Sequence, residues 1–232
     1  MSNETTPARR TYRKRLRAEQ EAQTHSQITE AAVNLHGTIG PARTTISAIA
    51  KEAGVQRATV YRHFPDMESV FAACSAHWWN LRPAPDPAAW RAIDDPDQRL
   101  RHALTELYDW FAWGEPMLTN VHRDAPLVPA SAKAGARFAA HFEALHYALM
   151  HGRKLRGRRH TRVAGAIGHT LAFPTWRSLT LEYGLTGSEA IDLMIALVHA
   201  AQTRTLRGDR PDRPSPHRRR ADRSPLTTSG PG

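Results

Sequence analysis

Hydrogen-bonding side chains crowd the segment from residue 56 to residue 63 of this 232-residue chain. Arg57 could donate two hydrogen bonds to the O6 and N7 atoms of guanine, and Gln56 could pair with adenine in a similar way. Three more side chains suit phosphate oxygens, which position a protein on a duplex without reading its sequence: Thr59, Tyr61 and His63. These residue types in this order indicate contact with the major groove of DNA.

Two short helices with a tight turn between them would position these side chains. Thr45 can cap the first helix, and Gly54 can supply the positive φ that a corner between two helices needs. Val55 would plug the corner and Val60 would anchor the second helix in the core. This arrangement is a helix-turn-helix, whose second helix enters the major groove. The alternative is an ordinary helical hairpin with a solvated polar face. The predicted DNA-contacting residues of the motif are Thr45, Gln56, Arg57, Ala58, Thr59, Tyr61, Arg62 and His63.

Positive charge accumulates near both ends of the chain. Lys and Arg number 32 against 22 Asp and Glu, which gives a formal net charge of +10. We expect residues 1–25 to form a flexible basic arm, in which Arg13, Lys14 and Arg15 contact the DNA backbone or the minor groove. Residues 207–232 combine charge with many prolines and are predicted to be a disordered basic tail, which either solubilises the protein or contacts DNA.

The N-terminal region resembles the DNA-binding domain of the tetracycline-repressor (TetR) family over about residues 26–75. The resemblance is carried by Ile28-x-x-Ala31-Ala32, then Thr44-Thr45-Ile46-x-x-Ile49-Ala50-x-x-Ala53-Gly54-Val55, then Thr59-Val60-Tyr61-x-His63-Phe64 and a helix start at Asp66. It implies three helices that bind DNA, joined by a fourth helix to a larger helical domain. It also implies that the larger domain forms a homodimer through its last helices and holds a small-molecule effector, whose binding releases the operator.

Two positions depart from the family's pattern. Gln56 stands where the family usually has Ser or Thr to cap the recognition helix, and Gln is a weaker cap. Met67 stands where the family usually has a Lys that binds phosphate, which a thioether cannot do. Both departures leave the affinity and the operator sequence open.

Helical periodicity continues along the rest of the chain and strand-like alternation is scarce, so we predict an all-α fold. Pro83, Pro85 and Pro87 divide the chain near residue 83. The predicted parts are the arm at 1–25, a helix-turn-helix domain with the start of a linking helix at 26–82, an effector-binding and dimerisation domain at 83–206, and the tail at 207–232.

Capping residues predict the ends of individual helices. Asp66 is a good N-cap for a helix that runs to about residue 81. Thr186 precedes Glu189 by three residues, a capping-box pattern that opens a final helix at about residue 187, and Gly184 lies where the preceding helix would end.

Small residues in the C-terminal domain favour a closely packed partner helix. Ala164, Gly168 and Ala172 fall four residues apart, on one face of a helix. Together with a helix at about 188–204, this face could form a four-helix bundle between two copies of the chain. The alternative is tight packing within one chain. Pro174 should kink or divide the small-residue helix.

Aromatic residues are frequent in two stretches, 77–113 and 173–183, and ligand pockets are typically apolar and aromatic with a few polar groups. Trp110 and Trp113 beside acidic residues could favour a cationic ligand through cation–π attraction. The alternative is that these rings are ordinary core. The predicted ligand-binding residues are Trp79, Glu106, Asp109, Trp110, Trp113 and Trp176.

Catalytic and metal sites are not indicated. Cys74 with His77, and His122 with Asp124, have the spacing of ligand pairs but lack further ligands at a recognisable spacing. No phosphate-cradling glycine loop or nucleophile elbow occurs. We therefore expect no enzyme activity, no metal and no cofactor. No apolar run approaches the ~18 residues of a membrane span and no signal peptide is indicated, so we expect a cytoplasmic protein with no membrane partner.

The function favoured by these residues is sequence-specific DNA binding that regulates transcription, with a repressor preferred because the resembled family consists mostly of repressors. The expected partners are a double-stranded DNA operator of near two-fold symmetry, a second copy of the chain and a small-molecule effector of unknown identity. The alternative is a DNA-binding regulator or architectural protein with no small-molecule effector, which a collapsed C-terminal core would favour. An enzyme would need histidines or acids that converge in one cleft.

Overall fold

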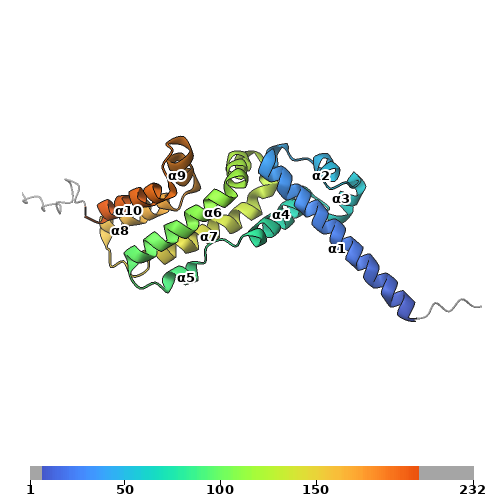
Figure 1. Cartoon of the computed structure of the whole chain (residues 1–232), viewed down its shortest axis with the longest axis horizontal. Helices are drawn as coiled ribbons and strands as arrows, with labels where there is room; N and C mark the ends of the chain where they lie inside the picture. The colour runs from blue at the N-terminus through green and yellow to red at the C-terminus, as the bar shows by residue number, and fades with distance from the viewer. Residues whose placement is uncertain (1–6, 204–232) are drawn as a thin grey trace, which may run out of the picture. The chain divides into compact units, whose positions relative to one another are not determined.

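The structure is a computed structural model that describes residues 7–203, with side chains from residue 11 onward (Figure 1). Its helices are α1 (Pro7–Thr38), α2 (Ile46–Glu52), α3 (Arg57–His63), α4 (Met67–Leu81), α5 (Pro87–Arg91), α6 (Pro96–Asp124), α7 (Ala132–Met150), α8 (Gly157–Thr170), α9 (Phe173–Arg177) and α10 (Gly187–Thr203). Short 3-10 turns and one π-helical turn, Ser178–Glu182, connect some of them. No strand occurs between residues 7 and 203, and the all-α prediction is confirmed. The predicted tail, 207–232, lies outside the described residues.

The helix ends follow the capping residues in the sequence. Asp66 and Ser69 form a reciprocal capping box at the start of α4, with the Ser69 N–H donating to Asp66 Oδ1 at 2.7 Å. Glu189 Oε2 accepts a hydrogen bond from the Thr186 N–H at 2.8 Å at the start of α10. Pro174 divides α8 from α9, as predicted, because a proline within the first turn of a helix cannot continue the preceding one.

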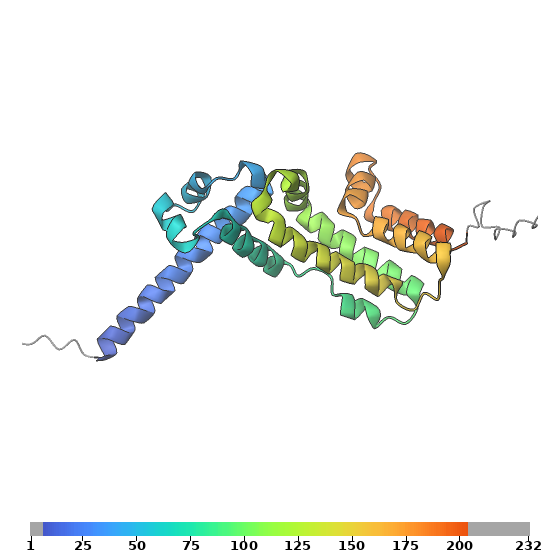
Figure 2. The ribbon, with the colours of Figure 1, turned by 180° about the vertical axis from the view of Figure 1, so that it is seen from behind.

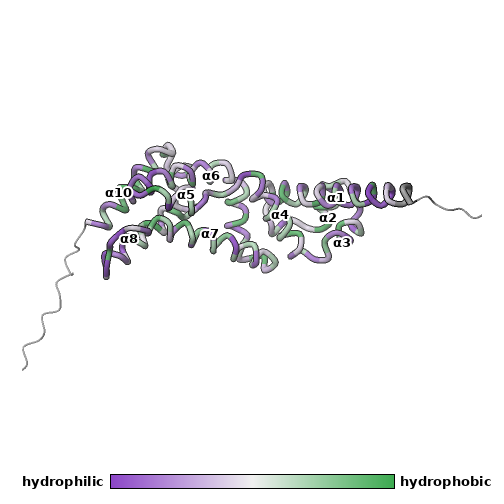
Figure 3. Tube along the Cα trace, turned by 90° about the horizontal axis from the view of Figure 1, so that it is seen from below, coloured by the Kyte–Doolittle hydropathy of each residue, from purple (hydrophilic) through white to green (hydrophobic). Residues whose placement is uncertain are grey.

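α1 is one continuous helix of 32 residues, so the prediction of a flexible arm over residues 1–25 is wrong from Pro7 onward. No glycine or further proline occurs before Gly37, and the strong helix formers Arg, Glu, Gln and Ala dominate its first turns. An Arg15–Glu19 ion pair of 3.4 Å adds i, i+4 support. The N-terminal turns extend beyond α2, α3 and α4 (Figures 1 and 2), and these outer turns are mainly hydrophilic (Figure 3).

Two hydrophobic cores hold the described helices together. The first lies among α1, α2, α3 and α4, where Ile28, Ile49 and Val60 have no exposed surface. The second surrounds α6, whose Leu104 and Phe111 are likewise fully buried against the helices that follow it. Burial of such side chains contributes roughly 1.5–3 kcal/mol each, so each core can fix the helices around it.

Side chains of α6 bind the backbone at the end of α1. The Asn120 side-chain amide donates hydrogen bonds to the carbonyl oxygens of His36 and Gly37, at 3.1 and 2.9 Å. One carboxylate oxygen of Asp124 accepts a hydrogen bond from the Ala42 N–H at 3.0 Å. The N-terminal helices are therefore attached to α6 by directional bonds as well as by apolar contact.

None of the helices from residue 7 to residue 203 combines the length and the hydropathy that crossing a bilayer requires.

Candidate functional site

The corner between α2 and α3 has the geometry that its sequence predicts. The Thr45 hydroxyl accepts a hydrogen bond from the Ala48 N–H at 3.1 Å and so caps α2. Gly54 has φ 66°, and the Val55 N–H donates to the Ala50 carbonyl at 2.9 Å, which closes the helix with a Schellman-type turn. These local bonds set the angle at which α3 leaves α2.

α3 is held by its apolar side and presents its polar side. Val60 has no exposed surface and Phe64, just after the helix, has 2%. Exposed positions on or next to α3 carry side chains able to contact DNA: Gln56, Arg57, Ala58, Tyr61 and Arg62. Thr59 is half-buried, and Thr45 is exposed at the start of α2. The Gln56 side chain makes no capping hydrogen bond, which leaves its amide available to a partner.

His63 is half-buried at the end of α3, and its predicted contact with phosphate stays a prediction. It follows Val60 by three residues, so the helical period turns it toward the core. Its ring centroid lies 6.1 Å from that of His25 on α1, and its Nε2 is buried without a hydrogen-bond partner in the described structure. Burial and the nearby Arg62 guanidinium lower the pKa of His63, which favours the neutral ring at pH 7.

The basic residues predicted to contact DNA from the N-terminal arm are placed by α1 on different sides. Arg13 and Lys14 are exposed. Arg15 is exposed as well, but it forms an ion pair with Glu19 and lies over the ring of Tyr12, with 5.9 Å from the guanidinium carbon to the ring centroid. Arg15 is therefore engaged within the helix.

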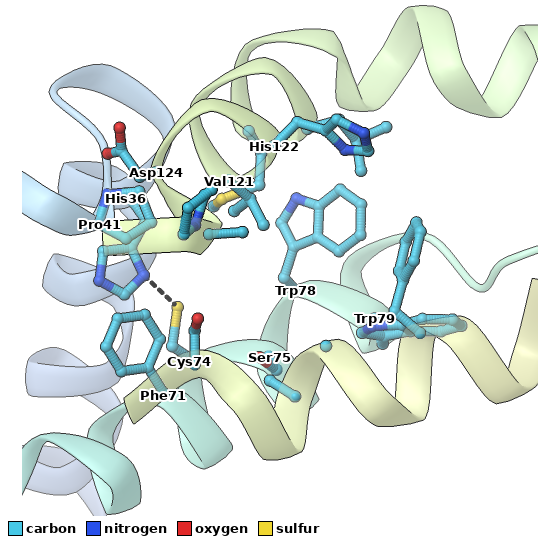
Figure 4. A pocket seen from close by; sticks show the side chains of 18 residues that line it. His36, Pro41, Phe71, Cys74, Ser75, Trp78, Trp79, Val121, His122 and Asp124 are labelled. Atoms are coloured by element: carbon cyan, nitrogen blue, oxygen red, sulfur yellow. Dashed lines mark hydrogen bonds between the residues drawn. The ribbon is translucent and has the colours of Figure 1, made fainter. Parts of the chain in front are cut away.

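An apolar pocket of about 330 Å³ lies where α1, α4, α6 and α7 meet (Figure 4). Its lining is mostly apolar, with a few polar groups: His36, Pro41, Phe71, Cys74, Ser75, Trp78, Trp79, Met117, Leu118, Val121, His122, Asp124, Ala125, Pro126, Ser131, Ala134, Gly135 and Phe138. Its volume and lining are those of a site for a small organic molecule. Because α1 and α4 also build the N-terminal core, a molecule in this pocket would touch the helix-turn-helix domain directly.

A histidine–cysteine pair forms one wall of the pocket. His36 Nδ1 and Cys74 Sγ are 3.1 Å apart and share a hydrogen bond, while the imidazole stacks on Phe71 with ring centroids 4.8 Å apart (Figure 4). Burial lowers the pKa of His36 to about 4 and raises the pKa of the Cys74 thiol to about 12. Both groups are therefore neutral at pH 7, and Cys74 lacks the thiolate character that redox chemistry needs.

Only Trp79 among the six predicted ligand-binding residues lines this pocket. Trp110 is 1% exposed and its indole N–H donates to the Arg82 carbonyl at 3.2 Å, so it is core. Trp176 is also core, in contact with Phe111.

The two acidic residues that were predicted to bind a ligand, Glu106 and Asp109, each pair with another side chain of the protein and do not line the pocket. Glu106 accepts a hydrogen bond from the indole N–H of Trp90 at 2.6 Å, and Asp109 pairs with Arg82. Trp113 lies close to the pocket without lining it, since it stacks on Trp78 with centroids 5.1 Å apart. The structure therefore supplies no acidic cage for a cationic ligand at these positions.

Most residues that line the pocket are absent from the set predicted from the sequence. On α4 a signal exists: Phe71, Cys74 and Trp78 recur at i, i+3 and i+7, an apolar stripe on one side of that helix. The contributions of Met117 and Phe138 depend on how α6 and α7 cross α4, and no local pattern specifies this crossing.

The small-residue stripe of α8 packs within the chain. His146 of α7 bonds the Ala164 carbonyl through Nε2 at 2.9 Å, and a Cβ at Gly168 would lie 3.8 Å from the same ring. Ala172 falls outside α8, which ends at Thr170. Ala164 and Gly168 therefore have a neighbour on α7 of the same chain, while Gly168 remains exposed.

Comparison with known proteins gives a family likeness for the N-terminal helices. Residues 28–74 match the model of the tetR family of bacterial regulatory proteins. The nucleoid occlusion factors SlmA of two Haemophilus influenzae strains, PittGG and Rd, are 32% identical to the chain over 125 residues. That match covers 53% of this chain and 57% of the relatives, so it spans little more than half of their length.

Solved structures share the fold over most of the chain. A TetR-like transcriptional regulator from Rhodococcus sp. RHA1 superposes with a TM-score of 0.54 at 19% identity, and covers 76% of this chain and 94% of its own. A Clostridium perfringens protein described as a candidate regulator of fatty acid metabolism superposes with a TM-score of 0.54 at 18% identity. The match covers 75% of this chain and 97% of the Clostridium chain. At such identities the likeness concerns the fold.

Proposed function

The chain belongs to the tetR family of bacterial regulatory proteins, and on that premise we propose that it is a homodimeric transcription factor, most simply a repressor, that a small apolar molecule releases from its operator. The observation that carries the proposal is the joint position of the pocket and the helix-turn-helix domain. α4 lines the pocket through Phe71, Cys74 and Trp78, and the same helix is part of the core that holds α3.

α3 is the proposed recognition helix. Arg57 and Gln56 lie exposed at its start, where a helix inserted into the major groove brings side chains to base edges. Tyr61 and Arg62 are exposed one turn later and suit flanking phosphates. His63 is left out of this contact set because its ring packs against α1.

A second copy of the chain is the proposed partner of α10. Leu193 and Leu197 fall four residues apart on this helix and are 47% and 38% exposed. On α8, Gly165 is exposed with no atom within 4 Å of a Cβ built there, so another backbone can approach it. Two such surfaces related by a two-fold axis would form a bundle of four helices.

The pocket chemistry favours an uncharged ligand. Asp124 is the one carboxylate of the lining, and it already accepts hydrogen bonds from the Arg123 side chain and the Ala42 N–H. No Lys or Arg lines the pocket, so an anionic ligand would lack a counter-charge. Trp78, Trp79 and the other rings instead offer broad apolar faces to a planar or aliphatic molecule.

Selection of genomic DNA fragments by the purified full chain tests DNA recognition. We expect enrichment of a near-palindromic site, which wild-type protein binds at least about 10³-fold more tightly than scrambled DNA at ~150 mM salt. Equal affinity for both DNAs would refute the proposal. Apolar compounds that raise the Tm of the free protein are then added to the complex, and those that bind the pocket should release the DNA.

A role outside promoter control is the second candidate, because the two curated relatives are nucleoid occlusion factors. It predicts enriched sites spread along the chromosome away from promoters, and an affinity for DNA that no pocket ligand changes. The same selection experiment separates the two functions by where the sites fall.

A further inference from the structure

The outer turns of α1 carry positive charge on one side of the helix. Arg13, Lys14 and Arg17 are all exposed. At about 100° per residue they fall within an arc of about 100°, with Arg17 between the other two. No ion pair joins any of the three to a carboxylate in the part of the chain that the structure describes. These three residues are called the cationic face of α1 below.

The cationic face continues the side of α1 that packs into the DNA-binding core. Ile28 is fully buried there and lies about 20° around the helix from Arg17. Three residues before Ile28, the His25 ring lies 4.5 Å from the ring of Phe64, just after α3. The cationic face therefore projects on the same side of α1 as the end of the recognition helix.

The opposite side of α1 is different in character. Arg15 lies about 160° from Arg17 around the helix and pairs with Glu19 at 3.4 Å. Tyr12 lies beneath its guanidinium. The charge on that side is thus largely balanced, whereas on the cationic face the first carboxylate is Glu21, a turn beyond Arg17.

We infer that the cationic face of α1 is a second DNA-contacting surface, which holds backbone phosphates flanking the bases read by α3. The inference rests on the proposed function and adds a partner surface to it. Arg13 lies 12 residues before His25, or about 18 Å along a helix axis, which corresponds to about five base pairs of duplex. Point charges on a continuous helix suit phosphates at fixed spacing, so these contacts should add affinity without adding sequence preference.

The experiment compares full-length variants on two duplexes that carry the selected site, one with ~10 flanking base pairs on each side and one trimmed to the site. In the triple variant Arg13→Gln, Lys14→Gln, Arg17→Gln, affinity for the long duplex should fall at least about tenfold. The slope of log affinity against log salt should become shallower by about 2–3 per bound protomer, since each lost phosphate contact removes about 0.9. On the trimmed duplex the triple variant and the wild type should differ little.

Arg15→Gln is the matched control, because it also removes one cation but from the opposite side of the same helix. Arg15→Gln should change the affinity for the long duplex by no more than about twofold and leave the salt slope unchanged. Arg13→Gln alone should weaken the affinity and make the salt slope shallower. An equal loss for Arg15→Gln and Arg13→Gln would mean a diffuse charge effect and would overturn the inference.

Two further outcomes would also overturn it. One is a triple variant that binds the long duplex as wild type does. The other is a triple variant that loses only its binding to vesicles of anionic phospholipid, which would assign the cationic face to a membrane surface. Failure of the proposed function looks different, since wild-type protein would then fail to distinguish the selected site from scrambled DNA.

Discussion

Replacement of Asn120 by leucine tests the bonded attachment between α6 and the end of α1. In the wild type the Asn120 amide donates to two backbone oxygens, those of His36 and Gly37, and its own carbonyl accepts from Arg123 at 3.0 Å. The residue is 8% exposed, so water does not readily replace these bonds. Leucine keeps a side chain of roughly similar size and removes all three hydrogen bonds.

The expected cost follows from these contacts. A net hydrogen bond contributes about 1 kcal/mol, and a buried acceptor left without a donor costs about 1–3 kcal/mol. Because His36 O and Gly37 O lie in the last turn of α1, where the helix itself supplies no donor, Asn120→Leu should lower the free energy of unfolding by about 2–4 kcal/mol.

Urea denaturation followed by tryptophan fluorescence measures this change, with Thr105→Val as the control. Thr105 is exposed on the same helix and its hydroxyl bonds only the Arg101 carbonyl, so its loss should cost under about 0.5 kcal/mol. If Asn120→Leu lowered the free energy of unfolding no more than Thr105→Val does, the Asn120 hydrogen bonds would not stabilise the attachment of α6 to α1.

Three further predictions concern single residues. Thr45→Ala should destabilise by about 1 kcal/mol in urea denaturation because it removes the cap bond to Ala48, and Thr45→Ser should restore it; no loss would contradict the capping role. Burial holds the pKa of His36 at about 4 in the folded protein, below its unfolded value of about 6.5, so the unfolded chain takes up the proton first as the pH falls. The free energy of unfolding should therefore be unaffected above pH 6.5 and should fall by up to about 3 kcal/mol toward pH 4. A His36→Gln variant with the same pH slope would exclude His36 as the cause. Ala134→Phe should fill part of the pocket and weaken ligand binding at least about tenfold in calorimetry while DNA binding persists; unchanged ligand affinity would place the ligand elsewhere.

The helix-turn-helix could be predicted from sequence because its determinants are local. Thr45 caps α2, Gly54 takes the positive φ and Val60 anchors α3, and each acts within a few residues of itself along the chain. His63 is the exception, because its placement depends on His25 of another helix. For α1, helix propensity outweighed the charge that had suggested a flexible arm.

The pocket could not be predicted in the same way because it forms between distant segments. His36 and Phe138 line it from positions about a hundred residues apart in the chain, and their approach depends on the crossing of α1, α4, α6 and α7. Aromatic content alone does not distinguish a ring in the core from a ring beside a cavity. Trp79 and Trp110 both belong to the aromatic-rich stretch 77–113, yet Trp110 is buried in the core while Trp79 lines the pocket.

Reading of DNA sequence by α3 is tested by comparing the affinity for the selected site with the affinity for scrambled DNA. Fluorescence anisotropy at ~150 mM salt measures the affinity of wild type and Arg57→Ala for the selected site and for scrambled DNA. Arg57→Ala should weaken binding to the selected site by about 1–3 kcal/mol, or about 5- to 150-fold, and change binding to scrambled DNA little. An equal loss on both DNAs, or no loss on the selected site, would contradict base recognition by α3.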